Sequence, residues 1–355
     1  MEYYRSRLTR AEREAYAAML RGYLALERVI RVPALSGRRL SELSFLLRLD
    51  HPEIFYIESL RCRTAPGAEN TELLPDYLFD RGRIQTHRQA LEARGTRLCR
   101  EASRFEGADR IRFLHDFLCE NVRYDKLKKA YSHEAIGPLT QGVGVCEGIA
   151  KSMKLLCDRL ELPCLIAVSL EAPEEGVPYR HAWNVVRLGR QSYHVDATYD
   201  LSLSAACGLT RRDYLLLDDR AIFRDHRPLV EPVPACTDAA SFYYKTARLS
   251  LTKPEDVGKR VQQAVRKKQP TLVLHWRGGM LTRAVLAQLL ETAEHAAQSG
   301  GKYCAASVNW PQAVLCLHFS DTPFQETAVL EQADEAQPLP PLPEEETTES
   351  AENGI

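Results

Sequence analysis

Three residues in the middle of the chain, Cys146, His181 and Asp196, are of the types that build a nucleophilic catalyst. A cysteine attacks a carbonyl carbon as a thiolate, and a neighbouring histidine takes up the thiol proton and later supplies a proton to the leaving group. An aspartate on the second ring nitrogen fixes the tautomer of that histidine. The residues follow one another at separations of 35 and 15 positions, and we predict that they form a catalytic triad.

The local sequence around Cys146 favours the anionic form of its side chain. Gly142 and Gly144 precede it, and apolar residues that include Met153 and Leu156 follow at helical spacing, so we predict an amphipathic helix that begins at Cys146. The unpaired N–H groups and the positive end of the dipole at a helix N-terminus stabilise a thiolate. The other nine cysteines lack this combination of a glycine-rich approach and a downstream His/Asp pair.

The two partner residues fall on predicted strands. Residues 164–170 read as a buried strand, and residues 181–188 and 191–199 read as two strands joined by a turn at Gly189-Arg190. Because side chains alternate along a strand, Asp196 can face the same side as an inward-pointing His181. The hairpin therefore brings the predicted base and its orienting carboxylate to one edge of a sheet.

These segments resemble the transglutaminase-like superfamily of papain-like enzymes, in which a Cys opens a helix and His and Asp lie on adjacent strands. The resemblance rests on Gly144-Val145-Cys146-Glu147-Gly148, His181-Ala182-Trp183-Asn184 and Val195-Asp196-Ala197-Thr198, and is closest to bacterial transglutaminase-like domain proteins. It covers about residues 111–200. The implied fold is α+β, with the Cys-bearing helix packed on an antiparallel sheet. The implied roles are nucleophile, base and orienter.

The resemblance extends less specifically to Asp50-His51-Pro52-Glu53, Tyr214-Leu215 and Asp225-His226. There are also departures from the family pattern. Glu147 follows the nucleophile where animal cross-linking transglutaminases have Trp, which argues against protein cross-linking, and Ile149 stands where many relatives carry Tyr. The chain has none of the zinc-binding CxxC pairs of the peptide:N-glycanase branch.

Three further residues are candidates for supporting the site. An oxyanion hole would use the backbone N–H of Cys146 and one side-chain donor. We nominate Gln141 in the glycine-rich loop as that donor, with Tyr124 as the alternative. Trp183 is expected to shield the His181–Asp196 hydrogen bond from water, and core packing is its alternative role.

The chain divides into four expected regions. Residues 1–105 read as a mainly helical N-terminal lobe, with a short strand near Ile54. Residues 106–235 form the expected catalytic core, and residues 236–322 a small α/β unit. Residues 323–355 form an acidic, Pro-rich tail that is expected to be disordered.

Composition narrows the classes of function. Of 355 residues, 45% are apolar and 27% are charged, as in ordinary globular proteins. Without the eight acidic residues of positions 331–355, the body has 47 basic and 40 acidic residues in no clustered runs, so no nucleic-acid partner is expected. No signal peptide or membrane span is predicted, and ten cysteines without a CxxC pair suggest reduced thiols in the cytoplasm.

No cofactor or metal is expected. His115 and Cys119 lie four positions apart on a predicted helix, which is half of a metal-binding pattern, but no second ligand pair accompanies them and we interpret both as packing residues.

The sequence therefore predicts a cysteine-dependent hydrolase or acyltransferase that acts on an amide through an acyl-enzyme, most simply a peptidase with a peptide or protein substrate. The alternative is a catalytically silent transglutaminase-like module that binds a peptide or a partner protein. The tail contains a Pro-Leu-Pro-Pro-Leu-Pro run at 338–343, which fits a polyproline ligand for a further partner.

Overall fold

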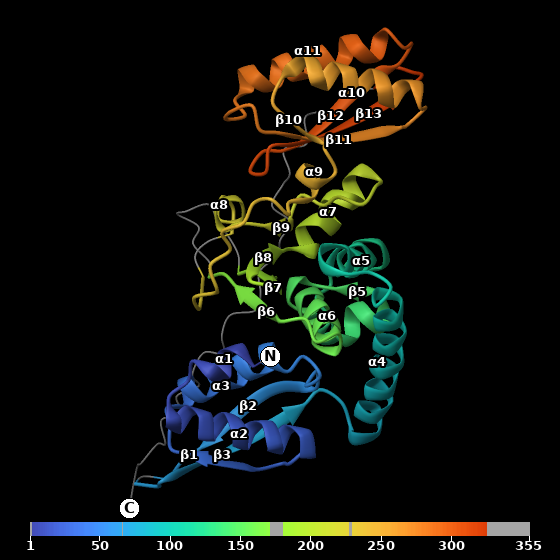
Figure 1. The fold of residues 1–355 in the computed structure, drawn as a ribbon. Helices are drawn as coiled ribbons and strands as arrows, with labels where there is room; N and C mark the ends of the chain where they lie inside the picture. Colours follow the sequence, from blue (N-terminus) through green and yellow to red (C-terminus); the bar gives the residue numbers. More distant parts are fainter. Residues whose placement is uncertain (1, 66, 171–179, 227–228, 325–355) are drawn as a thin grey trace, which may run out of the picture.

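The computed structural model describes residues 2–65, 67–170, 180–226 and 229–324. Three units follow one another along the long axis of the molecule: an N-terminal unit, a central core and a C-terminal unit (Figure 1). The predicted disordered tail begins at 323, and from residue 325 onward it lies outside the described residues.

The N-terminal unit combines helices with a three-stranded antiparallel sheet of order β1-β3-β2. Thr9 caps its longest helix in a capping box with Glu12. The sequence indicated one strand near Ile54, whereas the structure has three. In β2 a single residue of seven is buried, so apolar alternation gives little signal there. The elements are α1 (Tyr3–Ser6), α2 (Arg10–Ala25), β1 (Ile30–Pro33), α3 (Gly37–Asp50), β2 (Ile57–Arg63) and β3 (Asn70–Tyr77).

Helix α4 (Arg81–Ala102) connects this unit with the core. The sequence analysis grouped it with the N-terminal lobe, but it runs beside the core and packs against α6 (Cys146–Arg159) (Figure 1). Leu91 and Leu98, two helical turns apart, are among its buried apolar residues, and Glu92 pairs with Arg159 of α6 at 2.7 Å. The long helix therefore positions the back of the helix that begins at Cys146.

The core is built on an antiparallel sheet of order β6-β7-β8-β9, against which α6 packs. This confirms the predicted α+β arrangement of a Cys-bearing helix on an antiparallel sheet. Asn184 of β7 donates to the carbonyl of Ala150 in α6 at 2.9 Å and ties the two layers together. The elements are α5 (Gly107–Asn121), β4 (Arg123–Tyr124), η1 (Ala130–His133), η2 (Gly137–Gln141), β5 (Val143–Gly144), α6, β6 (Cys164–Val168), β7 (Ala182–Leu188), β8 (Gln191–Val195), α7 (Ala197–Cys207), β9 (Leu215–Leu217) and α8 (Asp219–Ile222).

The predicted hairpin joins β7 and β8. Leu188 pairs with Gln191 across the two-residue turn, and Gly189 has the positive φ of 60° that such turns require. The second strand is shorter than the predicted 191–199. It ends at Val195 because the Asp196 side chain accepts the first free N–H groups of α7 and starts that helix.

The C-terminal unit is a four-stranded sheet of order β10-β11-β13-β12, with α10 and α11 on one face (Figure 1). The predicted order of helix, strand, helix and two strands is observed. The other face packs on the core, where Val273 and Val314 share an apolar cluster with Leu203 and Tyr214. The elements are α9 (Tyr243–Thr246), β10 (Ser250–Leu251), α10 (Pro254–Arg266), β11 (Thr271–Trp276), α11 (Arg283–Gln298), β12 (Tyr303–Asn309) and β13 (Val314–Ser320).

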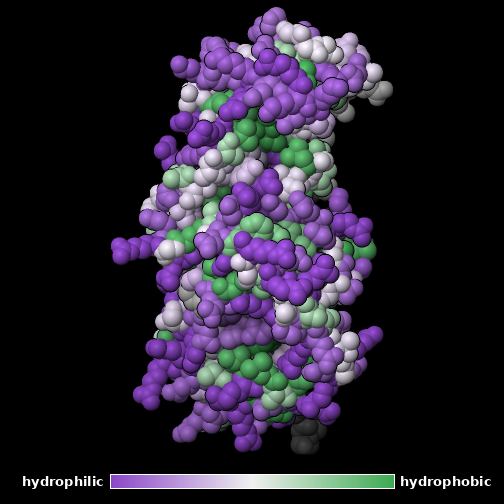
Figure 2. Space-filling model, turned by 45° about the vertical axis from the view of Figure 1, so that its right-hand side comes forward, coloured by the Kyte–Doolittle hydropathy of each residue, from purple (hydrophilic) through white to green (hydrophobic). Residues whose placement is uncertain are grey.

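The surface in Figure 2 is mostly hydrophilic, with separate small apolar patches. The large apolar side chains that are most exposed, Met280 and Leu127, belong to different units. Within the described part of the chain, no helix combines the length and the apolar character that crossing a membrane requires.

Candidate active site

Cys146 is the first residue of α6, as predicted, and its side chain is only 2% exposed. The segment before it approaches the helix closely. At Gly148, in the first helical turn, an added Cβ would lie 2.2 Å from the carbonyl oxygen of Ser132, and at Gly144 it would lie 2.5 Å from Pro138. Glycine is therefore required on both sides of the cysteine. The backbone N–H of Cys146 is one of the groups at a helix start that have no partner within the helix.

His181 lies directly before β7 and is 4% exposed. Its backbone N–H donates to Ser169 Oγ at 3.0 Å, which fixes the chain at the start of the strand. Its Nε2 lies 2.6 Å from Asp196 Oδ2, and its buried Nδ1 has no hydrogen-bond partner among the described residues. Burial alone would lower the pKa of His181, but the Asp196 carboxylate and the adjacent Cys146 side chain raise it to about 10.

Asp196 is held by hydrogen bonds to both of its carboxylate oxygens. Oδ1 accepts the backbone N–H groups of Thr198 at 2.8 Å and Tyr199 at 3.2 Å. Oδ2 forms hydrogen bonds with Nε2 of His181 and with Nε2 of His226, the latter at 2.8 Å. Burial acting alone would raise the pKa of Asp196, but the two histidines outweigh it and hold the pKa well below the ordinary range. The carboxylate is therefore charged and fixed in orientation.

His226 extends this arrangement by one more carboxylate. Its Nδ1 lies 2.6 Å from Asp225 Oδ1, and Tyr214 donates its hydroxyl to Asp225 Oδ2 at 2.6 Å. A carboxylate oxygen therefore lies within hydrogen-bond distance of each ring nitrogen of His226. Burial opposes a positive charge on the ring, but Asp225 and Asp196 raise the pKa of His226. Sequence reasoning did not assign His226 to the site; the only signal was the weak family match at Asp225-His226 and Tyr214-Leu215.

The remaining weak family match lies elsewhere. His51 is the C-terminal cap of α3, and the side chain of Asp50 accepts the backbone N–H groups of Tyr4 and Arg5 at the start of the chain. This segment therefore connects α1 with α3.

Aromatic rings enclose His181. Trp183 is 1% exposed and its ring lies nearly parallel to that of His181, at 6.0 Å and 13°. Tyr199 packs on His181 at 4.8 Å, and Trp183 also contacts His226 edge-on at 4.9 Å. The Trp183 Nε1–H donates to His194 Nδ1 at 3.0 Å, so the ring is anchored in the sheet. Its position combines core packing with cover over the imidazole.

The two candidate oxyanion donors differ in position. Gln141 lies at the exposed end of η2, where its amide donates to Thr140 Oγ1, and no hydrogen bond joins it to Cys146 or His181 among the described residues. Tyr124 pairs in register with Gly144, two residues before Cys146, and its hydroxyl is buried. Tyr124 is therefore the side-chain candidate that the fold brings to the segment before the nucleophile.

Glu147, the residue that departs from the cross-linking family pattern, belongs to a buried ion network. It lies 2.7 Å from Lys151 on the next turn of α6, and Lys151 also lies 2.8 Å from Glu134. Arg48 of the N-terminal unit reaches Glu134 at 3.2 Å. Burial works against ionisation, but Lys151 and His133 hold the pKa of Glu147 well below its usual range. The network therefore joins α6 to the N-terminal unit through Lys151, Glu134 and Arg48.

Three groups of side chains among the described residues bring potential metal ligands within 4.8 Å of one another. The first is the His181, Asp196 and His226 network itself. The second pairs His194 Nε2 with Asp219 at 2.8 Å, while Trp183 occupies the other ring nitrogen of His194. In both groups, hydrogen bonds already join the histidine rings to the carboxylates. The third group lies at the junction with the C-terminal unit and is treated below.

The helix that carries His115 and Cys119 packs behind the site. Both residues are buried, as expected for packing residues, but His115 is also an ionic partner. It lies 3.0 Å from Asp200 and 3.1 Å from Asp116. Burial opposes the charge, but Cys119 and these two carboxylates raise the pKa of His115.

Comparison with known proteins gives a family match over the central part of the chain. Residues 95–197 match the family model of the transglutaminase-like superfamily, a range that includes Cys146, His181 and Asp196. This segment is therefore a transglutaminase-like domain. No curated protein matches the chain.

Two solved structures are similar over 40% of this chain. One is a TGase, with 13% identity and a TM-score of 0.28 over 44% of its length. The other is a protein from Cytophaga hutchinsonii described as a proposed cysteine protease, with 18% identity and a TM-score of 0.27 over 62% of its length. This chain therefore matches less than two thirds of either protein.

Proposed function

We propose that the protein is a cysteine-dependent hydrolase or acyltransferase that cleaves an amide bond in a peptide or protein substrate. The observation that carries this proposal is the state of His181. Its Nε2 is committed to Asp196 at 2.6 Å, and its second nitrogen, Nδ1, is buried without a hydrogen-bond partner among the described residues. Nδ1 is therefore the atom that exchanges a proton with Cys146.

The proposed reaction begins when the Cys146 thiolate attacks the amide carbonyl carbon. The negative charge that develops on the carbonyl oxygen is stabilised by the backbone N–H of Cys146 and by a second donor, for which Tyr124 is the candidate. His181 gives its Nδ1 proton to the leaving amine as the C–N bond breaks, and a thioester to Cys146 remains.

His181 then acts as a base on the incoming nucleophile. If water attacks the thioester, the products are a carboxylic acid and free Cys146, and the protein is a peptidase. If an amine attacks, the acyl group is transferred. We propose hydrolysis as the principal reaction, since Glu147 is directed into the ion network with Lys151 and does not supply the Trp of the cross-linking enzymes.

A second candidate function is a silent module that binds a peptide or a partner protein. The burial of Cys146 and His181, at 2% and 4% exposure, favours it, since a covered triad gives a substrate no direct access. The two functions differ in one property: the enzyme needs a reactive thiolate at Cys146, and the binding module does not.

The test is alkylation of the full chain with iodoacetamide at mildly acidic pH, with each adduct located by mass spectrometry. Cys62 provides an internal reference, because the residue is exposed to the reagent. Partial desolvation of its sulfur raises the pKa of Cys62, so it stays a thiol at mildly acidic pH. Exposure alone predicts that Cys62 reacts before Cys146. An activated thiolate predicts that Cys146 reacts before Cys62. It also predicts that this fast reaction of Cys146 is lost in His181→Ala.

If Cys146 reacts more slowly than Cys62 in the wild type, Cys146 is not an accessible, activated thiolate and the binding module is the better description. If Cys146 reacts first, a peptide library is incubated with the wild type and with Cys146→Ala. Cleavage by the wild type alone identifies the hydrolase, and products joined to an added amine identify the acyltransferase.

A further inference from the structure

Two cysteines and a histidine that the active site does not use meet at the junction between the core and the C-terminal unit. Cys207 is the last residue of α7, and Cys316 and His318 lie two positions apart on β13, so both project from one face of that strand. Cys316 and Cys207 belong to the same buried apolar cluster, whereas Leu317 packs with the cluster under α10 and α11. The face that carries Cys316 and His318 is therefore the face that meets the core.

The three side chains have the spacing of metal ligands. One donor atom of each lies within 4.8 Å of the other two, and Cys316 Sγ is 3.5 Å from His318 Nε2. Bonds of about 2.3 Å from zinc to sulfur and about 2.0–2.1 Å from zinc to nitrogen, at a tetrahedral angle, place the two ligand atoms about 3.6 Å apart. This edge of the site therefore has the required length already.

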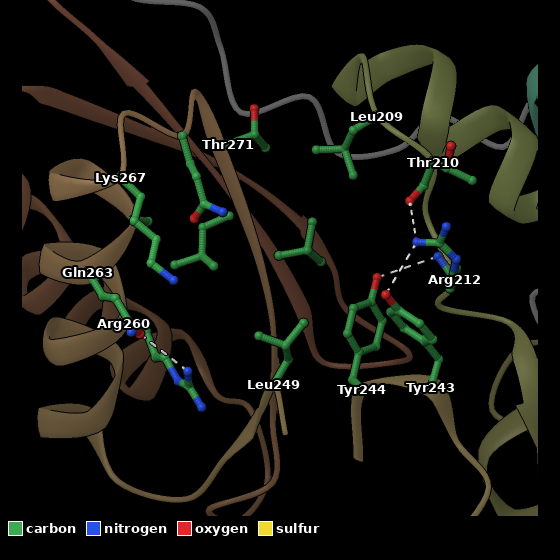
Figure 3. Close-up of a pocket in the computed structure, with 14 residues that line it drawn as sticks. Leu209, Thr210, Arg212, Tyr243, Tyr244, Leu249, Arg260, Gln263, Lys267 and Thr271 are labelled. Carbon is green, nitrogen blue, oxygen red and sulfur yellow. Dashed lines mark hydrogen bonds between the residues drawn. The ribbon is translucent and has the colours of Figure 1, made fainter. Parts of the chain in front are cut away.

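His318 is also oriented for this role. Its second ring nitrogen, Nδ1, lies 3.4 Å from Thr271 Oγ1 on β11, which leaves Nε2 directed at the cysteine. Thr271 also lines a pocket of about 310 Å³ between the two units (Figure 3). The pocket lies between Lys267 of the C-terminal unit and Thr210 of the core.

The negative charge that two thiolates would bring to this cluster is not balanced by a neighbouring cation. Arg211 Nη1 lies 3.0 Å from Cys207 Sγ, but Arg211 is already paired with both oxygens of Asp213, at 3.0 and 2.6 Å. When both cysteines are deprotonated, the cluster carries two negative charges that the Arg211–Asp213 pair does not balance.

We propose that Cys207, Cys316 and His318 bind one Zn²⁺ ion that fastens α7 of the core to β13 of the C-terminal unit. Cys thiolates and His imidazoles are the usual protein ligands of zinc, whereas Mg²⁺ and Ca²⁺ prefer oxygen ligands. Binding forms two Zn–S bonds and one Zn–N bond, and the thiol protons of Cys207 and Cys316 are released to solvent. Three protein ligands leave the fourth position to water. Arg211 then donates a hydrogen bond to the coordinated Cys207 sulfur.

The test uses the full chain, produced without an affinity tag in zinc-supplemented medium, and measures metal content by mass spectrometry after gel filtration. The expected result is one zinc per chain in the wild type and loss of the zinc in Cys316→Ser and His318→Ala. Cys304→Ser is the matched control, since Cys304 lies on the same sheet but packs with the cluster under α10 and α11. This control is expected to keep one zinc, and circular dichroism reports whether each variant folds.

Cobalt exchange in the wild type tests the ligands without any substitution. Replacement of zinc by Co²⁺ is expected to produce a thiolate-to-cobalt absorption band and tetrahedral ligand-field bands. The proposal is overturned if the wild type binds no stoichiometric zinc and shows no such bands, or if the isolated protein contains a Cys207–Cys316 disulfide. Neither outcome affects the alkylation of Cys146, so the zinc site and the proposed enzyme stand or fall separately.

Discussion

His181 determines the pH dependence expected at the scale of the single residue. Its pKa is raised to about 10 from an ordinary value near 6.5, against the effect of burial, by Asp196 and Cys146. A group whose pKa rises on folding contributes stability below its unfolded pKa and loses that contribution as the pH passes through the folded value. The contribution of His181 is thus complete below about pH 6.5 and is lost as the pH rises through about 10.

We therefore predict that the His181 ring remains doubly protonated at pH 8 in the wild type. Long-range nitrogen NMR of the imidazole measures this directly. In Asp196→Asn the main charge that raises the pKa is gone, so the ring should lose its proton at a lower pH. A His181 ring that is neutral at pH 8 in the wild type would contradict the thiolate–imidazolium pair and the mechanism built on it.

His226 is predicted to be a positioning residue, because it reaches Cys146 only through Asp196 and His181. His226→Phe removes one charge-assisted hydrogen bond to each of Asp196 and Asp225, with an expected loss of about 1.5–3 kcal/mol in unfolding free energy per bond. The freed Asp196 carboxylate should also orient His181 less well. We expect the alkylation of Cys146 to slow in this variant, and His226→Gln to restore part of the rate.

His115→Phe is the matched control for this prediction. His115 is also fully buried and bonded to a carboxylate, Asp200, but it makes no hydrogen bond to Asp196. Both variants should lower the denaturation midpoint, and only His226→Phe should slow the alkylation of Cys146. Equal slowing in both would mean that His226 acts through general stability alone.

At the scale of the element, α6 depends on the ion network behind the nucleophile. Lys151 is fully buried between Glu147 and Glu134. Removing one partner of a buried ion pair leaves uncompensated charge, so we predict that Lys151→Met lowers the free energy of unfolding by about 3–5 kcal/mol. Urea denaturation followed by circular dichroism measures this loss.

A double variant separates charge from packing in that network. In Lys151→Met with Glu147→Gln, the unpaired carboxylate beside Cys146 is removed together with the cation, and much of the lost stability should return. If the double variant is as unstable as the sum of the two single variants, the residues act independently. The network would then not be what joins the start of α6 to the N-terminal unit.

Elements with strong local signals could be predicted from the sequence. The glycines before Cys146 and the apolar spacing after it located α6, and Gly189-Arg190 located the β7–β8 hairpin. The end of β8 was extended too far, because an aspartate at a strand end and one at a helix N-cap have the same local pattern. His226 was not assigned, since its approach to Asp196 depends on how the irregular segment after β9 folds back, which no periodicity records.

At the scale of the whole molecule, local sequence patterns also could not predict the contacts between units. Cys207 and Cys316 carry no CxxC spacing, and β13 brings them together only after the C-terminal sheet has packed on the core. Local patterns therefore predicted the elements that carry Cys146, His181 and Asp196, whereas the ion network of Glu147 and the junction cluster required the tertiary structure.

The junction between the core and the C-terminal unit is organised around Asp213. Its carboxylate accepts hydrogen bonds from Arg211 of the core, from the Tyr244 hydroxyl on α9 at 2.8 Å, and from Asn309 at the end of β12 at 2.9 Å. All four residues are buried. The Asn309 side chain thus forms a direct hydrogen bond from the C-terminal sheet to a buried carboxylate of the core. Loss of this hydrogen bond should loosen the sheet from the core.

We predict that Asn309→Leu lowers the free energy of unfolding by about 1.5–3 kcal/mol, the usual value of a hydrogen bond to a charged group. Hydrogen exchange followed by mass spectrometry should show faster exchange in β12 and β13, with α6 and the β7–β8 hairpin unchanged, and alkylation of Cys146 at the wild-type rate. Ser299→Ala is the control, because its hydroxyl caps α11 within the same unit and is exposed. Faster exchange in α6 would show that the C-terminal unit and the active site unfold together.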